Sequence, residues 1–376
     1  MTPDEAVPES FGAELEQQPA ALRAAAASVR AQGDGMAALA AAARSPSTIA
    51  FTGMGGSYHT CYTPVTLLGE AGIAAVMVDA AELLHFRRPI LSADTVLVAV
   101  SQSGESAEVV RLLLESEWPR GRPFVVSVTN GRDNTVARAA DVAFDTAAGT
   151  ELGPSTKTFG AALVVLSAVA GALAGEAPDG TADRVEAEAH RAAGAVATLL
   201  DTRDGQRAAV RRWLGDRPTV AVVGRGTARA GAEMAALLFK EAARFPAESL
   251  EAAQFRHGPL ELAGPDLAVA MLATERATMD LDLRLAGDLS SAGTSVLVIG
   301  GRPGERHPAA ETIGLDIDAV PRSLAAAVAI VPLQLLTRDR ARERGRRPDR
   351  LAVASKVTTR EWPPGRADVR RRAPQP

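Results

Sequence analysis

The feature of this sequence that most limits its possible folds is an internal repeat. Three apolar runs in the first half return in the second half, two of them 171 positions later and one 172 positions later. The pairs are residues 48–55 with 219–226, 124–126 with 295–297, and 94–100 with 266–272. Because three separate segments agree in register within one residue, the sequence predicts two copies of one domain in tandem.

Each copy alternates strand-like and helix-like segments. In the first copy, short apolar runs occur at 48–53, 74–78, 95–100 and 124–128, and helical patterns such as 105–116 lie between them. Alternation of this kind predicts a parallel sheet with helices on both faces. The expected fold class is therefore α/β, with two tandem domains that each have three αβα layers.

The segments outside the repeat set the expected domain limits. We expect an N-terminal helical segment over residues 1–45, a first domain over 46–185, a second over 205–337, and a C-terminal segment over 338–376. A charged, glycine-containing stretch at 175–183 and a helix from Arg184 to Asp204 would join the two halves. The Pro- and Arg-rich tail from Pro363 has the composition of a disordered terminus.

Composition excludes several classes of protein. The formal net charge of −4 argues against a nucleic-acid-binding surface. Cys61 is the single cysteine, so neither a disulfide framework nor a cysteine-based zinc site is expected. The sequence has no signal-peptide pattern, and its longest apolar stretch, Phe159–Ala174, is interrupted by glycines and predicts a buried helix. We therefore expect a cytoplasmic protein with no metal and no membrane or nucleic-acid partner.

A serine-rich motif gives the clearest chemical signal. Residues 101–106, with the sequence Ser-Gln-Ser-Gly-Glu-Ser, follow an apolar strand and precede an amphipathic helix. Three hydroxyls and several N–H groups would gather at the helix N-terminus, where free amides and the helix dipole favour an anion. We interpret the motif as a phosphate-binding loop, although Ser103 or Ser106 could instead only cap the helix. The second copy has Ala273 where the first has Ser101, so this loop is expected only in the first copy.

Two glycine loops, at 53–58 and 224–229, also follow strands. Neither fits the dinucleotide-binding pattern, because Tyr58 and Arg229 stand where the third glycine is required. The sequence also has no G-x-x-x-x-G-K-[ST] loop, so a nucleoside triphosphate is not expected. We expect no cofactor.

Several further motifs occur in a fixed order along the chain. They are LEQQPAAL at 15–22, GGSYH at 55–59, SQSGES at 101–106, AGTELGPSTKTF at 148–159, FKEAARFPAESLEAAQFRHGP at 239–259, and SKVTTRE at 355–361. In this order they resemble the SIS (sugar isomerase) domain family, and the isomerase module of glucosamine-6-phosphate synthase in particular. The resemblance extends over nearly the whole chain.

The resemblance implies an enzyme that acts on a phosphorylated sugar. The glutamine-hydrolysing domain of the synthase has no counterpart here, so the stand-alone relatives are the better guide. These are amino-sugar-phosphate deaminases, aldose–ketose isomerases and fructosamine-phosphate deglycases. The implied reaction is isomerisation of a hexose or hexosamine 6-phosphate, with or without loss of ammonia, by proton transfer between C1 and C2. A homodimer with shared active sites is also implied.

The resemblance assigns catalytic roles to Glu241, His257 and Lys356. Glu241 would move the proton, and His257 would open the sugar ring from the neighbouring subunit. Lys356 would close over the substrate and form a Schiff base with a ketose. Without the resemblance, Glu241 and Lys356 would be interpreted as solvated charges, and His257 as a residue that fixes its own Gly-Pro turn.

The resemblance also assigns residues that would hold the substrate and its phosphate. They are Gly55, Gly56, Ser57, Ser101, Gln102, Ser103, Ser106, Glu151, Ser155 and Glu248. Lys157, in the same segment as Ser155, fits a structural role as well as a functional one.

Two positions depart from the usual pattern of the family. The helix that carries Glu241 has Leu238 where the family usually has a lysine, and Met234 where it usually has a glutamate. Glu233 is adjacent, but it lies about 100° away around a helix. We therefore expect one polar wall of the usual pocket to be missing, which predicts an altered substrate or the loss of a catalytic step. The alternative function is a non-catalytic sensor that binds a sugar phosphate and signals through a partner.

Overall fold

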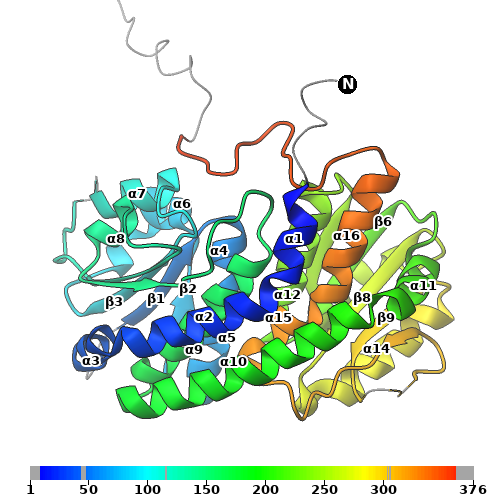
Figure 1. The fold of residues 1–376 in the computed structure, drawn as a ribbon, viewed down its shortest axis with the longest axis horizontal. Helices are drawn as coiled ribbons and strands as arrows, with labels where there is room; N and C mark the ends of the chain where they lie inside the picture. The colour runs from blue at the N-terminus through cyan, green and yellow to red at the C-terminus, as the bar shows by residue number, and fades with distance from the viewer. Residues whose placement is uncertain (1–8, 44–47, 115–116, 303, 305, 361–376) are drawn as a thin grey trace, which may run out of the picture.

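A computed structural model of the chain describes residues 9–43, 48–114, 117–302, 304 and 306–360. It contains two five-stranded sheets, and every strand pairing in them is parallel. The first sheet has the order β2-β1-β3-β4-β5 and the second has the order β10-β9-β8-β6-β7. The strands of the first sheet are β1 (Thr48–Gly53), β2 (Ala75–Met77), β3 (Thr95–Val100), β4 (Phe124–Thr129) and β5 (Val142–Asp145). Those of the second are β6 (Thr219–Gly224), β7 (Ala247–Glu251), β8 (Leu267–Ala273), β9 (Ser295–Gly300) and β10 (Glu311–Ile313). The predicted α/β fold with two tandem copies is confirmed (Figure 1).

The two sheets have the same topology when their strands are matched by the repeat. Strand β6 corresponds to β1, β8 to β3 and β9 to β4, so both sheets follow the order 2-1-3-4-5 in their own numbering. In this arrangement the chain leaves the first and third strands in opposite directions. The crevice at the carboxyl ends of those two strands is where open α/β sheets bind ligands. Each copy therefore has one such crevice, between β1 and β3 and between β6 and β8.

The helices of the first half lie before, between and after its strands. They are α1 (Ser10–Glu16), α2 (Gln18–Ala31), α3 (Gly33–Ala42), α4 (Gly55–Thr60), α5 (Tyr62–Glu70), α6 (Ala80–Glu82), α7 (Ala107–Leu114), α8 (Thr135–Ala139) and α9 (Lys157–Leu173). Two short helical turns, η1 (Leu83–Arg87) and η2 (Arg88–Ile90), follow α6. The second half contains α10 (Pro178–Asp201), α11 (Arg203–Leu214), α12 (Ala228–Glu241), α13 (Ala252–Phe255), α14 (Met279–Ser291), α15 (Ala325–Ala329) and α16 (Val331–Glu343). Its short turns are η3 (Pro259–Leu262), η4 (Arg276–Thr278) and η5 (Arg322–Leu324).

Alternate residues of the central strands pack into different layers. In β3, Val96, Val98 and Val100 join the core that contains α9, whereas Leu97 and Ala99 pack with α7. The second sheet repeats this alternation, with α12 on its inner face and α14 on its outer face. The inner faces of both sheets contribute to one shared core, and α12 contacts α4 and α5 of the first half. This shared core fixes the first half of the chain against the second.

The apolar stretch near residue 159 forms a buried helix, as predicted. All 17 residues of α9 are buried, and α2, α5 and α10 pack around it. In the part of the chain that the structure describes, no helix combines the length and the apolarity that a membrane span requires.

The connection between the halves differs from the prediction. Helix α10 begins at Pro178, inside the stretch expected to be a linker, and ends at Asp201 rather than Asp204. Proline fits the first turn of a helix because the amide that it lacks would have no partner there. The N-terminal segment that was expected to be helical forms three helices within residues 9–43, namely α1, α2 and α3. The predicted disordered tail from Pro363 lies outside the described residues.

The C-terminal segment, residues 344–360, returns from α16 across the first sheet (Figure 1). Asp349 accepts a hydrogen bond from the Ser10 amide at 2.9 Å, which ties the segment to α1. Further along, the Thr358 carbonyl accepts one from the Ala107 amide, at the start of α7, also at 2.9 Å. The segment therefore covers the crevice between β1 and β3.

Candidate active site

A cavity of about 250 Å³ lies where the crevice of the first sheet meets α12 and the C-terminal segment. Many residues predicted for the site line this cavity. They are Gly55, Gly56, Ser57, Gln102, Ser103, Ser106, Ser155, Glu241 and Lys356. Five segments far apart in the sequence thus meet at the carboxyl ends of β1 and β3, where open α/β sheets bind ligands.

The serine-rich loop is held in shape by its own hydrogen bonds. The buried Ser101 hydroxyl accepts from the Gly104 amide at 3.1 Å and lies 3.2 Å from the Ser106 hydroxyl. The Ser57 hydroxyl accepts from the Gln102 amide at 3.2 Å, which joins this loop to the first glycine loop. Ser101 therefore shapes the loop from behind, while Ser103 and Ser106 line the cavity.

Gly104 is the residue in this loop that no other amino acid can replace without strain. Its φ of 66° lies in the left-handed region, and an added Cβ would overlap the carboxamide of Asn134. That carboxamide is needed where it is, because it caps α8 through the Ala137 amide at 2.8 Å. Glu105 also bonds to α8, through the Thr135 amide at 2.8 Å. The loop is thus held in shape by contacts with its neighbours.

Glu241 is the last residue of α12, and its carboxylate lines the cavity. Burial raises the pKa of Glu241 above its ordinary value, while the nearby charges of Lys356 and Lys240 oppose the rise. A raised pKa makes a carboxylate a stronger base, which suits a group that takes a proton from carbon and returns it.

Met234 and Leu238, the two residues that depart from the family pattern, lie in different surroundings. Met234 lines the cavity, and its sulfur lies 3.1 Å from the place that a Cβ on Gly56 would occupy. Leu238 is fully buried and is not part of the lining, whereas Leu237 is. Glu233 bonds to Arg229 at 3.3 Å and to the Ser249 hydroxyl, and it does not line the cavity. One wall of the cavity is therefore apolar.

Lys356 is held in place by the loop at 151–153. Its ammonium lies 3.3 Å from the Glu151 carboxylate and donates a hydrogen bond to the Gly153 carbonyl. The Glu151 side chain is fully buried, and it also accepts from the Thr156 amide at 2.8 Å and from the Thr158 hydroxyl. Glu151 does not line the cavity. Instead, Glu151 holds the segment that contains Ser155 through its bonds to Thr156 and Thr158. It also holds the ammonium of Lys356, which lines the cavity.

Two predicted residues lie away from the cavity. His257 follows α13 and is exposed, and its backbone amide donates to the Gln254 carbonyl at 3.0 Å. Glu248 is exposed on β7, an edge strand of the second sheet. Lys157 is buried, and its ammonium donates to the side-chain oxygen of Gln17 at 2.6 Å. Within one chain, therefore, the structure brings Glu241 and Lys356 together but not His257.

The corresponding crevice of the second sheet is filled by a carboxylate of the protein itself. Glu275 occupies the position that matches Ser103 in the repeat, and it is buried. It accepts hydrogen bonds from the Thr227 amide at 2.8 Å and hydroxyl at 2.6 Å, and from Arg322 at 2.8 Å. Sequence reasoning missed Glu275, and the one available signal was the lost serine at Ala273. In the second crevice, the Glu275 carboxylate thus takes the hydrogen bonds of Thr227 and Arg322.

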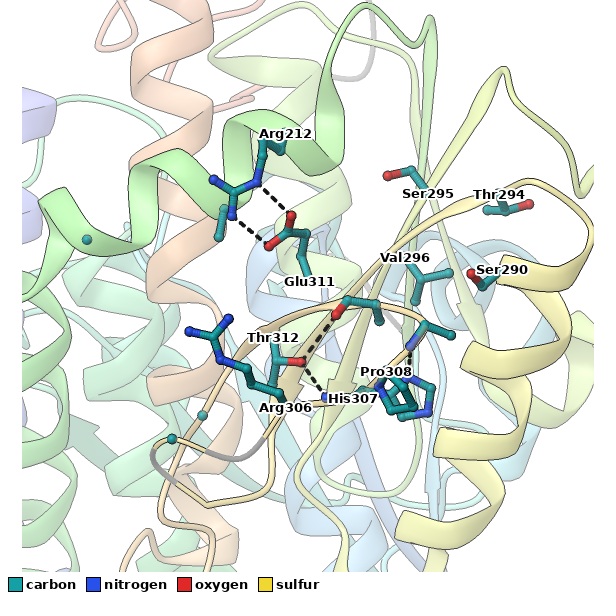
Figure 2. Close-up of a pocket in the computed structure, with 16 residues that line it drawn as sticks. Arg212, Ser290, Thr294, Ser295, Val296, Arg306, His307, Pro308, Glu311 and Thr312 are labelled. Atoms are coloured by element: carbon teal, nitrogen blue, oxygen red, sulfur yellow. Dashed lines mark hydrogen bonds and ion pairs between the residues drawn. The ribbon is translucent and has the colours of Figure 1, made fainter.

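A larger hollow of about 810 Å³ lies elsewhere on the second domain (Figure 2). It is lined by Arg212 and Glu311, which pair at 2.8 Å, and by Ser295 and His307 among others. Ser295 and Glu311 begin β9 and β10, so the hollow lies at the amino ends of these strands. None of the predicted site residues lines it. In the described ranges, no group of three or more metal-ligating side chains is placed to hold a metal ion.

Comparison with known proteins identifies the repeated unit. The SIS domain family matches residues 43–172 and 214–341 of this chain. The glutamine–fructose-6-phosphate aminotransferase (isomerizing) of Pyrococcus horikoshii is 32% identical over 315 residues, which are 83% of this chain and 52% of that protein. The Streptomyces coelicolor enzyme of the same name is 31% identical over 293 residues, or 76% of this chain and 47% of its own length. The chain thus spans about half the length of these relatives.

Solved structures show the same fold. The C-terminal domain of glucosamine-fructose-6-phosphate aminotransferase from Francisella tularensis superposes with a TM-score of 0.80 at 22% identity, covering 93% of this chain and all of that one. Tagatose-6-phosphate ketose/aldose isomerase from Escherichia coli superposes with a TM-score of 0.73 at 19% identity, covering 94% of this chain and 97% of that one.

Proposed function

The chain belongs to the SIS domain family, and on that premise we propose that it interconverts the aldose and ketose forms of a hexose or hexosamine 6-phosphate. A general role as a sugar-phosphate isomerase agrees with its relatives and structural neighbours. Whether ammonia is released with an amino sugar is part of the proposal. Because sugar phosphates of this kind are made inside cells, we also propose a cytoplasmic location.

One observation carries the proposal: a single cavity is lined by the serine-rich loop, a partly buried carboxylate and a lysine. The serine hydroxyls and the amides at the start of α7 suit a phosphate, because they donate hydrogen bonds to an anion. Glu241 and Lys356 lie on α12 and on the C-terminal segment, away from that loop. A phosphate in the loop would direct the rest of an open-chain sugar toward both residues.

The proposed chemistry is a proton transfer between neighbouring carbons. Glu241 takes the proton from C2 of the aldose, which leaves an enediolate with its negative charge on O1. The hydroxyl proton of O2 then passes to O1, and Glu241 returns its own proton to C1 to give the ketose. The Lys356 ammonium stabilises the negative charge that develops on the sugar oxygen during this step. With a ketose, the same amine can condense with the carbonyl once it has lost its proton.

Ring opening is proposed to come from a second subunit. Sugar phosphates are mostly cyclic, so an acid or base must open the ring before Glu241 can act. An imidazole can act as an acid or as a base, so His257 suits this task, but it is exposed and lies outside the cavity of its own chain. We therefore propose a homodimer in which His257 of each chain serves the cavity of the other.

The alternative is a sensor that binds a sugar phosphate without converting it. The observation that favours it is Met234, which gives the cavity an apolar wall close to Gly56. A sensor would need the phosphate loop but not Glu241. The two functions therefore differ in whether Glu241 exchanges a proton with the bound sugar.

The test is hydrogen exchange in D₂O, followed by NMR, with a panel of hexose and hexosamine 6-phosphates. The proposal predicts deuterium at C1 or C2, and its loss in Glu241→Gln. Glu233→Gln is the matched control, because this second acid of α12 bonds to Arg229 and Ser249 instead of lining the cavity. Binding without exchange across the panel would establish the sensor. Ammonia released from glucosamine 6-phosphate would identify the deaminating form of the reaction.

The shared site has its own test. Glu241→Gln and His257→Asn should each be inactive alone. After the two variants are mixed and allowed to exchange subunits, mixed dimers would contain one intact site, restoring about a quarter of the wild-type rate. If His257 served its own chain, mixing would restore nothing.

A further inference from the structure

We propose that Glu108, at the start of α7, recognises the open-chain form of the sugar by accepting a hydrogen bond from its 5-hydroxyl. The inference rests on the proposed function in taking a hexose or hexosamine 6-phosphate as the ligand. It adds a substrate-binding residue and a preference for one form of the substrate. Glu108 thus selects the form on which Glu241 acts.

Glu108 is a buried acid that lines the cavity. It is the second residue of α7, and it is only 9% exposed. The Thr358 carbonyl accepts a hydrogen bond from the Ala107 amide at 2.9 Å, so the C-terminal segment covers this end of the helix. Val357 and Thr358 line the same cavity. The Glu108 side chain therefore faces the cavity rather than open solvent.

The carboxylate of Glu108 has no protein partner. Within the residues that the structure describes, it makes neither a hydrogen bond nor an ion pair. The Lys356 ammonium, which also lines the cavity, bonds instead to Glu151 and to the Gly153 carbonyl. The helix dipole favours an acid in the first turn, but it does not replace the hydrogen bonds that a carboxylate loses on burial. A ligand that enters this cavity should therefore bring a donor to Glu108.

The position of Glu108 on α7 determines which part of the sugar it can reach. Ser106, in the proposed phosphate loop, comes two residues earlier, which is about 3 Å along the helix axis. Glu241 and Lys356 lie on α12 and on the C-terminal segment. With a phosphate in the loop, Glu108 lies beside the carbons next to the phosphate, and Glu241 beside C1 and C2. A carboxylate repels the phosphate itself, so its partner is an uncharged donor on the sugar.

The sugar oxygen next to the phosphate group differs between the two forms of the substrate. In a hexose 6-phosphate this oxygen is O5. It is an ether oxygen without a proton in the pyranose and furanose rings, and it becomes a hydroxyl when the ring opens. A carboxylate accepts a hydrogen bond from a hydroxyl but repels the lone pairs of an ether oxygen. Glu108 therefore stabilises the open chain and holds it while Glu241 moves the proton.

Two unreactive ligands with the same phosphate provide the test. D-Glucitol 6-phosphate is an open chain with a 5-hydroxyl, whereas 1,5-anhydro-D-glucitol 6-phosphate keeps O5 as a ring ether. Neither has a carbonyl, so neither can be isomerised. The affinity of each is measured by calorimetry in EDTA, which excludes a metal ion bridging Glu108 and the phosphate. The readout is the ratio of the two affinities, in which the repulsion between Glu108 and the shared phosphate cancels.

Glu108→Gln keeps the size of the side chain, and its amide N–H can donate to the ring ether. The ratio of open-chain to ring affinity should fall about tenfold or more, because a hydrogen bond to a charged group is lost. Glu108→Ala should lower the ratio as well. Glu233→Gln is the matched control and should leave the ratio unchanged. Its side chain is 16% exposed, but it bonds to Arg229 and Ser249 and does not line the cavity.

Urea unfolding separates this role from a structural one. Because no described residue bonds to the Glu108 carboxylate, Glu108→Gln should unfold at the wild-type urea concentration or a higher one. A wild-type affinity ratio in the folded Glu108 variants would overturn the inference and leave the isomerase function standing. If neither ligand binds the wild-type protein, the proposed function fails and the inference fails with it.

Discussion

Replacing Glu275 should show how much stability the protein gains by filling its second crevice with its own carboxylate. Glu275 accepts two hydrogen bonds from Thr227, at 2.8 and 2.6 Å, and its carboxylate is 6% exposed. It also pairs with Arg322, which is 43% exposed and has a second partner in Glu70 at 2.7 Å. The Glu275→Ala variant removes all of these contacts at once.

The expected loss follows from the burial of each contact. Buried hydrogen bonds to a charged group contribute about 1.5–3 kcal/mol each, so the two from Thr227 account for most of the loss. The Arg322 pair adds only about 0–1 kcal/mol, because the arginine is partly exposed and keeps Glu70. We expect Glu275→Ala to lower the free energy of unfolding by about 3–7 kcal/mol. Glu275→Gln should lose only about 1–2 kcal/mol, because its amide oxygen can still accept from Thr227.

The assay is urea unfolding followed by the fluorescence of Trp213, which is buried against the second sheet and bonded to Val269. Trp118 and Trp362 would first be replaced by phenylalanine, so that the signal reports the second domain alone. In phosphate buffer, as compared with chloride of equal ionic strength, Glu275→Ala should recover part of its loss, because phosphate can enter the vacated site. A loss below about 1 kcal/mol, with no response to phosphate, would refute the account of Glu275 as an internal anion.

Three other changes test the first crevice. Gly104→Ala should lower the free energy of unfolding, measured in urea, by about 2–4 kcal/mol. The backbone at this position is left-handed, and the added methyl group would overlap the Asn134 side chain. Wild-type stability of the variant would show that the loop is free to move. Ser103→Ala with Ser106→Ala should weaken glucose 6-phosphate about 10–100-fold by calorimetry, through the loss of two hydrogen bonds to an anion, and equal weakening of glucose would mean that the loop does not hold the phosphate. Lys356→Met removes a positive charge that lowers the pKa of Glu241. The acidic limb of the pH profile of deuterium exchange should therefore move to higher pH. If this limb does not move, the two groups are not coupled.

The fold was predictable because its signals are local and repeated. Strands such as β1 and β3 are buried runs that alternate with helices, and their copies recur at a fixed offset. The strands β5, β7 and β10 were not predicted, because they lie at sheet edges and are only four, five and three residues long. The start of α10 was missed because charges and a glycine in its first turns resemble a linker.

The site residues that belong to short sequence motifs could be predicted. Ser103, Glu241 and Lys356 belong to recognisable segments, and the structure places them around one cavity. Glu108 and Glu275 were missed because nothing local marks a glutamate that will be buried. Their surroundings come from tertiary structure, since the C-terminal segment covers the helix end that carries one and Thr227 binds the other.

The C-terminal segment has a consequence for how the protein is made. It brings Lys356 to a cavity whose other walls come from earlier parts of the chain, and α1, near the start, holds the loop that receives this lysine. During translation both sheets can therefore emerge and pack while the cavity still lacks its lysine. A chain whose synthesis stops before residue 356 has the serine-rich loop but lacks that amine.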